Sequence, residues 1–457
     1  MLFPAPDMGS LQAISPLDGR YSNKISPLVD YFSELALIKR RVLVEIEYLI
    51  QLSEDGVIEK IDSKTKKELR NIVENFDLNE GKLVKDIEGN IRHDVKSVEY
   101  YLRHKFADLN FSYLNPFIHI GLTSEDVNSV AYRLMLKEVL GNVIIPKLEL
   151  VSGELGKFIA KNKRVPMLAR THGQAALPTL LGKEFAVFVS RLKIQIEQLK
   201  RIRLRAKFGG AVGNMSALKF AFPNYDWMQF GQNFLSKFKL DRALPTTQIA
   251  PGDDLAEVFH VMMRINSILI DLDQDIWRYI SDGWFVQKGK KGFVGSSTMP
   301  QKINPIEFEN SEGNLQLANG MFHFLSGKLP ISRLQRDLSD STVLRNVGVG
   351  FGHSLIGYLS FIQGIKVLGI DKQKIKQALF SDWSILGEAA QVLLRNTGEQ
   401  DAYEQVAELL RGIKVGEKEW KKLVSKLKLN KRDMQKLLKL TPANYIGLSQ
   451  VMADHRR

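Results

Sequence analysis

The chain has 457 residues, of which 44% are hydrophobic and 25% are charged, a composition typical of a globular protein with two or three domains and a large core. It contains no cysteine, which excludes disulfides, cysteine nucleophiles and thiolate metal sites and is expected of a protein of the reducing cytoplasm. The formal net charge of +13 favours anionic partners, either nucleic acids or small anions such as nucleotides and dicarboxylates.

The sequence predicts neither a secretory signal nor a membrane-spanning segment. Residues 1–16 have no basic start and no long apolar run, so a secretory signal is not expected. The most apolar window, residues 351–370, contains histidine, serine, glutamine and lysine, which favours a buried helix over a membrane span. We therefore expect no membrane partner.

Residues 11–113 are predicted to form helices joined by polar turns. Arg20 and Tyr21 lie in a loop before the first long helix, where such a pair can hold a phosphate, although a lone arginine in a turn is usually just solvated. His93 and Asp94 stand at a helix start, where an aspartate suits both the cap and the helix dipole.

The next two polar segments also precede helices. Thr123 and Ser124 open a helix, and plain capping is the simpler explanation for both of them. His172 lies in a T-H-G-Q loop before a long helix, so it is not a core histidine, but a loop histidine is more often a surface residue than a catalytic one. Residues 209–216 are predicted to form a glycine-rich bend.

Gln248 lies in the loop before the most regular helix of the chain. Apolar residues recur there with alternating spacings of three and four from Leu255 to Ile276, as in the seam of a long bundle helix. Strand-like alternation is scarce and several helices are long, so the sequence predicts an all-α fold built on an elongated bundle whose seams can continue across subunits.

The helices shorten after about Ile370, and residues 414–440 are dense in lysine, which indicates a small C-terminal helical domain with a solvated basic face. We predict an N-terminal helical domain at residues 1–115, a central long-helix domain at 116–368 and a C-terminal domain at 369–457.

The most informative stretch runs from Gly292 to Asn310, G-F-V-G-S-S-T-M-P-Q-K-I-N-P-I-E-F-E-N. Amides of a glycine-flanked loop, a helix start and Lys302 can together hold an anion. Such surroundings can also stabilise a serine alkoxide as a base, since a serine is otherwise a poor one. An ordinary polar loop before a helix explains the spacing equally well.

The pattern S-S-x-M-P-x-K-x-N in this stretch resembles the signature of the fumarase/aspartase superfamily, and the following E-N-S-E-G-N is similar to its adenylosuccinate lyase branch. The resemblance extends from S-P-L-D-G-R-Y to T-P-A-N-Y-I-G. It implies three helical domains, a homotetramer with active sites shared between subunits, and no metal or other cofactor. It also implies a C–N lyase of purine biosynthesis, which releases fumarate from adenylosuccinate to give AMP, and from succinylated aminoimidazole carboxamide ribotide (SAICAR) to give the amide AICAR.

The same resemblance implies roles for individual residues. His172 corresponds to the general acid that protonates the departing nitrogen, and Ser296 to the base that takes the proton from the succinyl β-carbon. Ser297, Lys302 and Asn304 correspond to carboxylate binders. The remaining substrate contacts implied are Arg20, Tyr21, Arg92, His93, Asp94, Thr123, Ser124, Gln248, Ile303, Asn310, Arg336, Ser341, Thr342, Val343, Leu344 and Arg345.

One residue departs from the pattern, because Arg92 stands where the close relatives usually have asparagine, which leaves the substrate role of position 92 open. Three alternative functions agree less well with the sequence. A sister lyase acting on argininosuccinate, malate or aspartate is disfavoured by the phosphate-binding elements. A nucleic-acid-binding protein is disfavoured because, apart from Trp420, no aromatic residue interleaves with the basic tail, so nucleic acid is not an expected partner. A non-catalytic scaffold is disfavoured by the intact His172 and Ser296.

Overall fold

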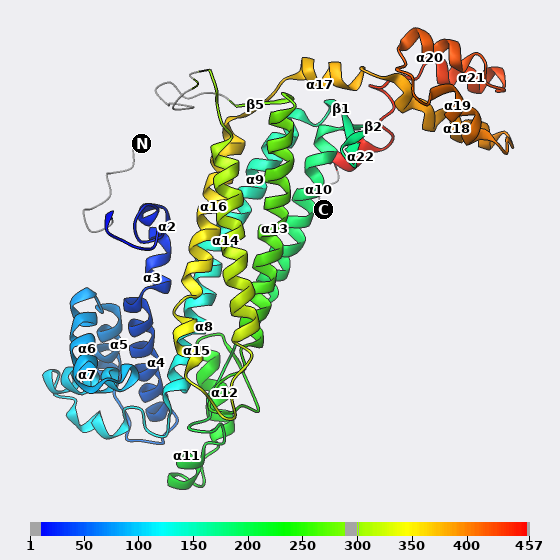
Figure 1. The fold of residues 1–457 in the computed structure, drawn as a ribbon. Helices are drawn as coiled ribbons and strands as arrows, with labels where there is room; N and C mark the ends of the chain where they lie inside the picture. The colour runs from blue at the N-terminus through cyan, green and yellow to red at the C-terminus, as the bar shows by residue number, and fades with distance from the viewer. Residues whose placement is uncertain (1–10, 288–298, 300, 455–457) are drawn as a thin grey trace. The chain divides into compact units, whose positions relative to one another are not determined.

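The computed structural model describes residues 11–287, 299 and 301–454 and is predominantly helical, which confirms the predicted fold class (Figure 1). Its internal contacts divide the chain into two compact units. Unit 1 comprises Met1–Leu148, Gln195–Ser267 and Gly313–Tyr358, and unit 2 comprises Glu149–Ile194, Ile268–Glu312 and Leu359–Arg457. None of the helices within the described residues has an apolar stretch long enough to cross a membrane.

The N-terminal part of unit 1 is a group of helices joined by short turns. They are α2 (Ser22–Ile25), the 3-10 turn η1 (Ser26–Leu28), α3 (Val29–Phe32), α4 (Glu34–Glu54), α5 (Ser63–Glu74), α6 (Leu78–Ile91), α7 (Asp94–Asp108), the 3-10 turn η2 (Ser112–Phe117) and α8 (Ser124–Val139). Side-chain caps fix several of their starts, because Ser33, Asp62 and Asp77 each accept a backbone N–H from the first turn. Helix α4 packs against α8.

Five long helices contribute residues to both units, because every boundary between the units falls inside one of them. These helices are α9 (Ile145–Asn162), α10 (Leu181–Arg201), α13 (Asp253–Ser281), α14 (Ile306–Lys328) and α16 (Val347–Val367). The predicted seam of α13 is confirmed, because its apolar positions from Leu255 to Ile276 are all buried. A π-helical turn, η3 (Leu140–Ile144), joins α8 to α9 just before Pro146, which has no N–H to continue the α-helical pattern.

Aromatic side chains pack between these helices within each unit. In unit 1, Phe259 of α13 stacks on Phe322 of α14 with 5.5 Å between ring centroids, and Phe351 of α16 lies against both rings. In unit 2, Phe158 of α9 packs on Phe185 of α10 at 4.9 Å. The long helices are therefore held by large, fully buried rings.

The strands found in the described residues are few, short and paired two by two. In unit 2, β1 (Pro166–Thr171) pairs with β2 (Gln174–Leu180) and β5 (Phe285–Gln287) with β6 (Leu368–Ile370), both antiparallel. In unit 1, β3 (Arg205–Ala206) pairs in parallel with β4 (Asp241–Arg242). The expectation of a plain loop before α10 was therefore wrong, because β1 and β2 form a hairpin there.

The remaining helices are short. Unit 1 contains α11 (Ser216–Ala221), α12 (Trp227–Lys237) and α15 (Ser339–Leu344). Unit 2 ends in α17 (Lys372–Leu379), η4 (Trp383–Leu386), α18 (Gly387–Asn396), α19 (Ala402–Leu410), α20 (Glu417–Val424), α21 (Lys431–Leu438) and α22 (Ser449–Asp454). Trp420 is 2% exposed, so the aromatic ring of the lysine-rich segment belongs to the core.

Candidate active site

The turn between α6 and α7 places three predicted site residues in succession. Arg92 ends α6 with a left-handed backbone (φ 56°), a conformation that suits glycine or asparagine better than arginine. His93 is the N-cap of α7, and its Nδ1 accepts the backbone N–H of Lys96 at 3.1 Å. Asp94 follows as the first residue of the helix.

The carboxylate of Asp94 lies between two arginines from distant parts of the chain. Its Oδ2 accepts from Arg41 of α4 at 2.7 Å and from Arg345, which follows α15, at 3.0 Å. Burial raises the pKa of this carboxyl, but the charges and hydrogen bonds of Arg41 and Arg345 outweigh burial and lower the pKa to about 2. Asp94 is thus a permanent anion that holds Arg345 in place.

Arg41 carries the network from Asp94 to the start of α8. Its side chain is 1% exposed, and its Nε donates to Asn128 Oδ1 at 2.9 Å. Asn128 Nδ2 donates to Glu125 Oε1 at 2.7 Å, and Arg336 pairs with the same oxygen at 3.0 Å. The predicted residues Asp94, Arg336 and Arg345 therefore belong to one continuous set of buried and half-buried charges in unit 1.

The segment around α15 contains the other predicted residues of this region. Arg345 donates to the hydroxyl of Ser341 at 2.7 Å and to its carbonyl at 3.1 Å. Thr342, Val343 and Leu344 complete the helix, in which Asn346 donates to the carbonyl of Thr342. Arg345 Nε also faces Glu34 Oε2 at 3.5 Å. A guanidinium has five N–H groups, so one N–H on Nη2 remains for an anion beyond those directed at Ser341, Asp94 and Glu34.

Asp126 ties the Thr123–Ser124 turn to the glycine-rich bend. Its two carboxylate oxygens accept the backbone N–H of Thr123 at 2.8 Å, that of Gly209 at 2.7 Å and that of Gly210 at 3.0 Å. The ammonium of Lys207, which is fully buried, donates to Asp126 at 2.7 Å. Thr123 is the N-cap of α8, and Ser124 is the first helical residue. Helix capping therefore accounts for the position of Thr123, and Ser124 lies in the first turn.

Gln248 lies against the same bend. Its side-chain amide donates to the carbonyl of Ala211 at 2.9 Å. Gly213 has φ +82°, and a Cβ there would lie 2.1 Å from the carbonyl oxygen of Thr246. Only glycine allows this approach, so the bend fixes the loop that carries Gln248.

The Arg20–Tyr21 pair lies at the surface of unit 1. The Arg20 guanidinium lies over the Tyr21 ring at 5.9 Å, and Arg20 is exposed. The loop before the pair borders a cavity of about 240 Å³ whose walls include Asp18, Phe32 and Arg345. The walls include Arg345 but neither Arg20 nor Tyr21, so the cavity does not by itself join this pair to Arg345.

In unit 2, His172 occupies the tip of the β1–β2 hairpin. Thr171 pairs with Gln174, so His172 and Gly173 form a two-residue turn with φ of 53° and 73°. Positive φ at both positions is typical of a type I′ turn, which is uncommon for a histidine. The turn leaves His172 exposed.

The signature loop is described only from Met299 onward, except for Pro300, and Ser296 and Ser297 lie outside the described residues. The N–H of Lys302 donates to the carbonyl of Met299 at 3.0 Å, and Lys302 and Ile303 are exposed. Asn304 is half-buried, and Pro305 precedes α14, as predicted. Asn310 Nδ2 donates to Ser360 Oγ at 2.6 Å, which orients it toward α16.

Several residues of unit 1 that the sequence reasoning missed organise the predicted ones. They are Arg41, Glu125, Asp126, Asn128 and Lys207. A charged residue within an apolar helical pattern, as at Arg41, was the available signal. The described residues contain no group of three or more His, Asp or Glu side chains placed to hold a metal ion.

The chain is similar to known protein families and to individual proteins along nearly its whole length. A family described as lyase matches residues 19–320, and one described as adenylosuccinate lyase C-terminal matches residues 332–446. The chain is 45% identical to an adenylosuccinate lyase of Legionella pneumophila (strain Corby), over 96% of this chain and 97% of the relative. It is 42% identical to the adenylosuccinate lyase of Haemophilus influenzae, over 98% of this chain and 99% of the relative.

Among solved structures, a fumarate lyase from Mesorhizobium sp. BNC1 is similar with a TM-score of 0.77 at 19% identity. That similarity covers 95% of this chain and 97% of the other chain. A 3-carboxy-cis,cis-muconate lactonizing enzyme from Pseudomonas putida is similar with a TM-score of 0.72, also at 19% identity. At this level of identity, both structures show a shared fold.

Proposed function

The chain belongs to the lyase family and to its adenylosuccinate lyase branch, and from this premise we propose that it eliminates fumarate from adenylosuccinate to give AMP and from SAICAR to give AICAR. The observation that carries the proposal is the identity of 41–45% to adenylosuccinate lyases over nearly the full chain. Its place is in purine nucleotide biosynthesis in the cytoplasm.

In the proposed reaction, a base removes a proton from the succinyl carbon next to a carboxylate, and the C–N bond breaks. The electrons of the broken C–H bond form the C=C bond of fumarate, and those of the C–N bond pass to the nitrogen, which takes a proton from an acid. Fumarate and the second product, AMP or the amide AICAR, then leave. We assign the base to Ser296 and the acid to His172, because histidine is the side chain most often used for general acid–base catalysis. The exposed Lys302 and loop amides would hold the succinyl carboxylate on which negative charge develops.

Unit 1 supplies the proposed nucleotide side of the reaction. Arg345 is held by Asp94 and Ser341 and borders the hollow beside the Arg20 loop. A guanidinium whose position is already fixed loses little rotamer freedom when it binds a phosphate. This supports a phosphate contact at Arg345, to which the family resemblance adds Arg20 and Tyr21.

We further propose that the protein is a homotetramer in which neighbouring subunits complete each site. An exposed His172 is poorly placed for acid catalysis in bulk water, and a neighbouring subunit could cover it. The long helices of unit 2 also expose large apolar side chains, with Leu150 at 40%, Val187 at 45%, Ile194 at 62% and Trp277 at 45%. Such residues on several helices are typical of subunit interfaces.

Fumarate release from adenylosuccinate by the purified protein, followed by ultraviolet absorbance, tests the reaction. We expect turnover of adenylosuccinate and SAICAR, and none of argininosuccinate, malate or aspartate. Turnover of a sister substrate without turnover of adenylosuccinate would contradict the assignment.

A further inference from the structure

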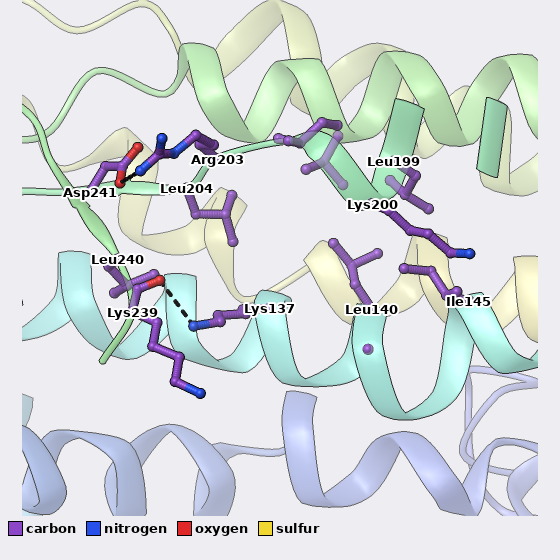
Figure 2. Close-up of a pocket in the computed structure, with 13 residues that line it drawn as sticks. Lys137, Leu140, Ile145, Leu199, Lys200, Arg203, Leu204, Lys239, Leu240 and Asp241 are labelled. Carbon is purple, nitrogen blue, oxygen red and sulfur yellow. Dashed lines mark hydrogen bonds and ion pairs between the residues drawn. The ribbon is translucent and has the colours of Figure 1, made fainter. Parts of the chain in front are cut away.

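A hollow of about 380 Å³ lies in unit 1 among segments that carry none of the predicted site residues (Figure 2). Its walls come from the C-terminal end of α8, the π turn η3, the first residue of α9, the last turn of α10, residues in or next to β3 and β4, and α13. The lining residues are Lys137, Leu140, Gly141, Ile145, Leu199, Lys200, Ile202, Arg203, Leu204, Lys239, Leu240, Asp241 and Val258. This volume falls within the range of about 300–1,000 Å³ found for small-molecule sites.

The hollow has an apolar middle with cations toward both ends (Figure 2). Leu140, Leu199 and Leu204 lie between Lys200 on one side and the Lys137 and Arg203 region on the other. Apolar walls with a few polar groups at defined positions are typical of sites for small organic molecules.

The charge of the lining is strongly positive. Four of the lining residues are cations, and Asp241 is the one acid among them, already paired with Arg203 at 2.6 Å. Lys200 pairs with Glu197 at 2.9 Å across the surface of α10, where an exposed pair is worth little. With four cations and one acid, the lining has a net formal charge of +3, which favours entry of an anion.

Lys137 is fixed at one end by the backbone. Its Nζ donates to the carbonyl of Phe238 at 2.8 Å and to that of Lys239 at 3.0 Å, just beyond the C-terminal end of α12. Figure 2 shows the bond to Lys239. An ammonium has three donors, so one N–H remains for a ligand. Burial, followed by the nearby charge of Lys239, lowers the pKa of Lys137, and a bound anion would oppose both effects.

Two irregular backbone segments shape the walls. The π turn η3 contributes Leu140 and Gly141, and Lys239 has a left-handed backbone with φ 54°. π turns and left-handed non-glycine residues carry an energetic cost and occur often at functional sites.

We propose that this hollow binds a small organic anion with an apolar body and a single carboxylate, phosphate or sulfonate head. The body would lie on Leu140 and Leu204, and the head would bind Lys200 or Lys137. Because all of its walls belong to unit 1 and include no residue assigned to catalysis, this site is independent of the proposed lyase chemistry.

Gly141 allows the hollow to be filled without disturbing the fold. A Cβ built at Gly141 meets nothing within 4 Å, and the same holds for the exposed helical Gly153 in α9, which lies away from the hollow. Gly141→Leu therefore places a side chain where the ligand would lie, and Gly153→Leu is the matched control.

The test uses the fluorescence of 8-anilinonaphthalene-1-sulfonate titrated with the full-length protein, and its displacement by octanoate or octanol. We expect Gly141→Leu to weaken octanoate binding at least about tenfold while Gly153→Leu leaves it unchanged, and octanol to compete at least about tenfold more weakly than octanoate. Thermal midpoints and fumarate release should match the wild type in both variants.

Equal octanoate binding by Gly141→Leu and wild type would overturn the proposal, as would equal competition by octanol and octanoate. If Gly141→Leu does not fold, Lys137→Met and Lys200→Met provide the test. At least one of them should weaken octanoate binding and leave octanol binding unchanged, and unchanged octanoate binding in both variants would overturn the proposal.

Discussion

The buried aspartates of unit 1 contrast with one buried aspartate of unit 2. In unit 1, Asp94, Asp126 and Asp254 each meet a cation in a buried or half-buried pair. In unit 2, Asp273 is 1% exposed and faces Glu312 rather than a cation, and burial raises its pKa well above the ordinary value although Ser311 opposes the shift.

The predicted site residues of the two units also differ in how firmly their side chains are held. Those of unit 1, such as Asp94 and Arg345, are held by side chains from distant segments. Of those described in unit 2, His172 and Lys302 are exposed on a turn and a loop, whereas Asn310 is held by Ser360 of α16. We infer that unit 1 is a preorganised binding scaffold, whereas unit 2 presents reactive groups that need a further surface to enclose them.

The largest effect is expected from the exposed histidine of unit 2. His172→Ala should lower kcat for fumarate release by about 10²–10⁴-fold, the usual contribution of a positioned general acid. Its thermal midpoint should stay within a degree or two, because the side chain is exposed. His104→Ala removes another exposed histidine, in unit 1, and should leave kcat unchanged. Similar kcat values for the two variants would remove His172 from the mechanism.

Breaking a buried pair of unit 1 should have the largest effect on stability. Lys207→Met leaves Asp126 as a buried anion without its cation and should cost about 3–5 kcal/mol of unfolding free energy. Lys421→Met breaks an exposed pair with Glu417 in unit 2 and should cost at most about 1 kcal/mol. Chemical denaturation measures the unfolding free energy of both variants. Equal losses would contradict the expectation that a buried ion pair of unit 1 contributes more to stability than an exposed pair of unit 2.

The pH dependence of stability should have opposite signs in the two units. The folded pKa of Asp273 is raised, so its contribution to stability is greatest at low pH and is lost as the pH rises above about 4, the unfolded pKa. Asp273→Asn should therefore gain in thermal midpoint relative to wild type, and should gain more at pH 8 than at pH 5.

Asp94 provides the opposite case. Its folded pKa is about 2, so its stabilisation is present above pH 4 and is lost as the pH falls toward 2. Asp94→Asn should lose stability relative to wild type at pH 7 and lose progressively less toward pH 3. Equal pH profiles for the two asparagine variants would contradict the contrast between the units.

The smallest effect concerns backbone strain in unit 1. A left-handed backbone costs a non-glycine residue about 1–2 kcal/mol, and the greater unfolded freedom of glycine offsets about half of that. Arg92→Gly should therefore raise the unfolding free energy by up to about 1 kcal/mol, measured by denaturation with Lys60→Gly outside a helix as the control. A loss of stability in Arg92→Gly would show that the Arg92 side chain does more than end α6.

The sequence allowed the helices to be predicted where periodicity was strong. The seam of α13 and the start of α14 after Pro305 were predicted because apolar spacing and a proline act locally. The β1–β2 hairpin was missed because its strands are short and its Pro178 is unusual in a strand. The three-domain division at residues 115 and 368 stays a prediction.

The site was predictable only in part. Motifs identified the loops, and the resemblance supplied roles for His172 and Ser296, which stay predictions. The pairing of Arg41 with Asp94 joins residues 53 positions apart, and local sequence patterns carry no information about such contacts. The left-handed backbone at Arg92 is a conformation that favours asparagine, the residue that the resemblance implies at this position.

Mixing two inactive variants tests most directly whether the exposed groups of unit 2 work in a site shared between subunits. His172→Ala and Ser296→Ala are each expected to be inactive as homogeneous proteins. After subunit exchange in equal amounts, about a quarter of the sites would combine an intact His172 with an intact Ser296 from another subunit, so about a quarter of the wild-type fumarate release should return. No recovery after exchange has been verified would show that the two residues do not meet across subunits and would contradict the account.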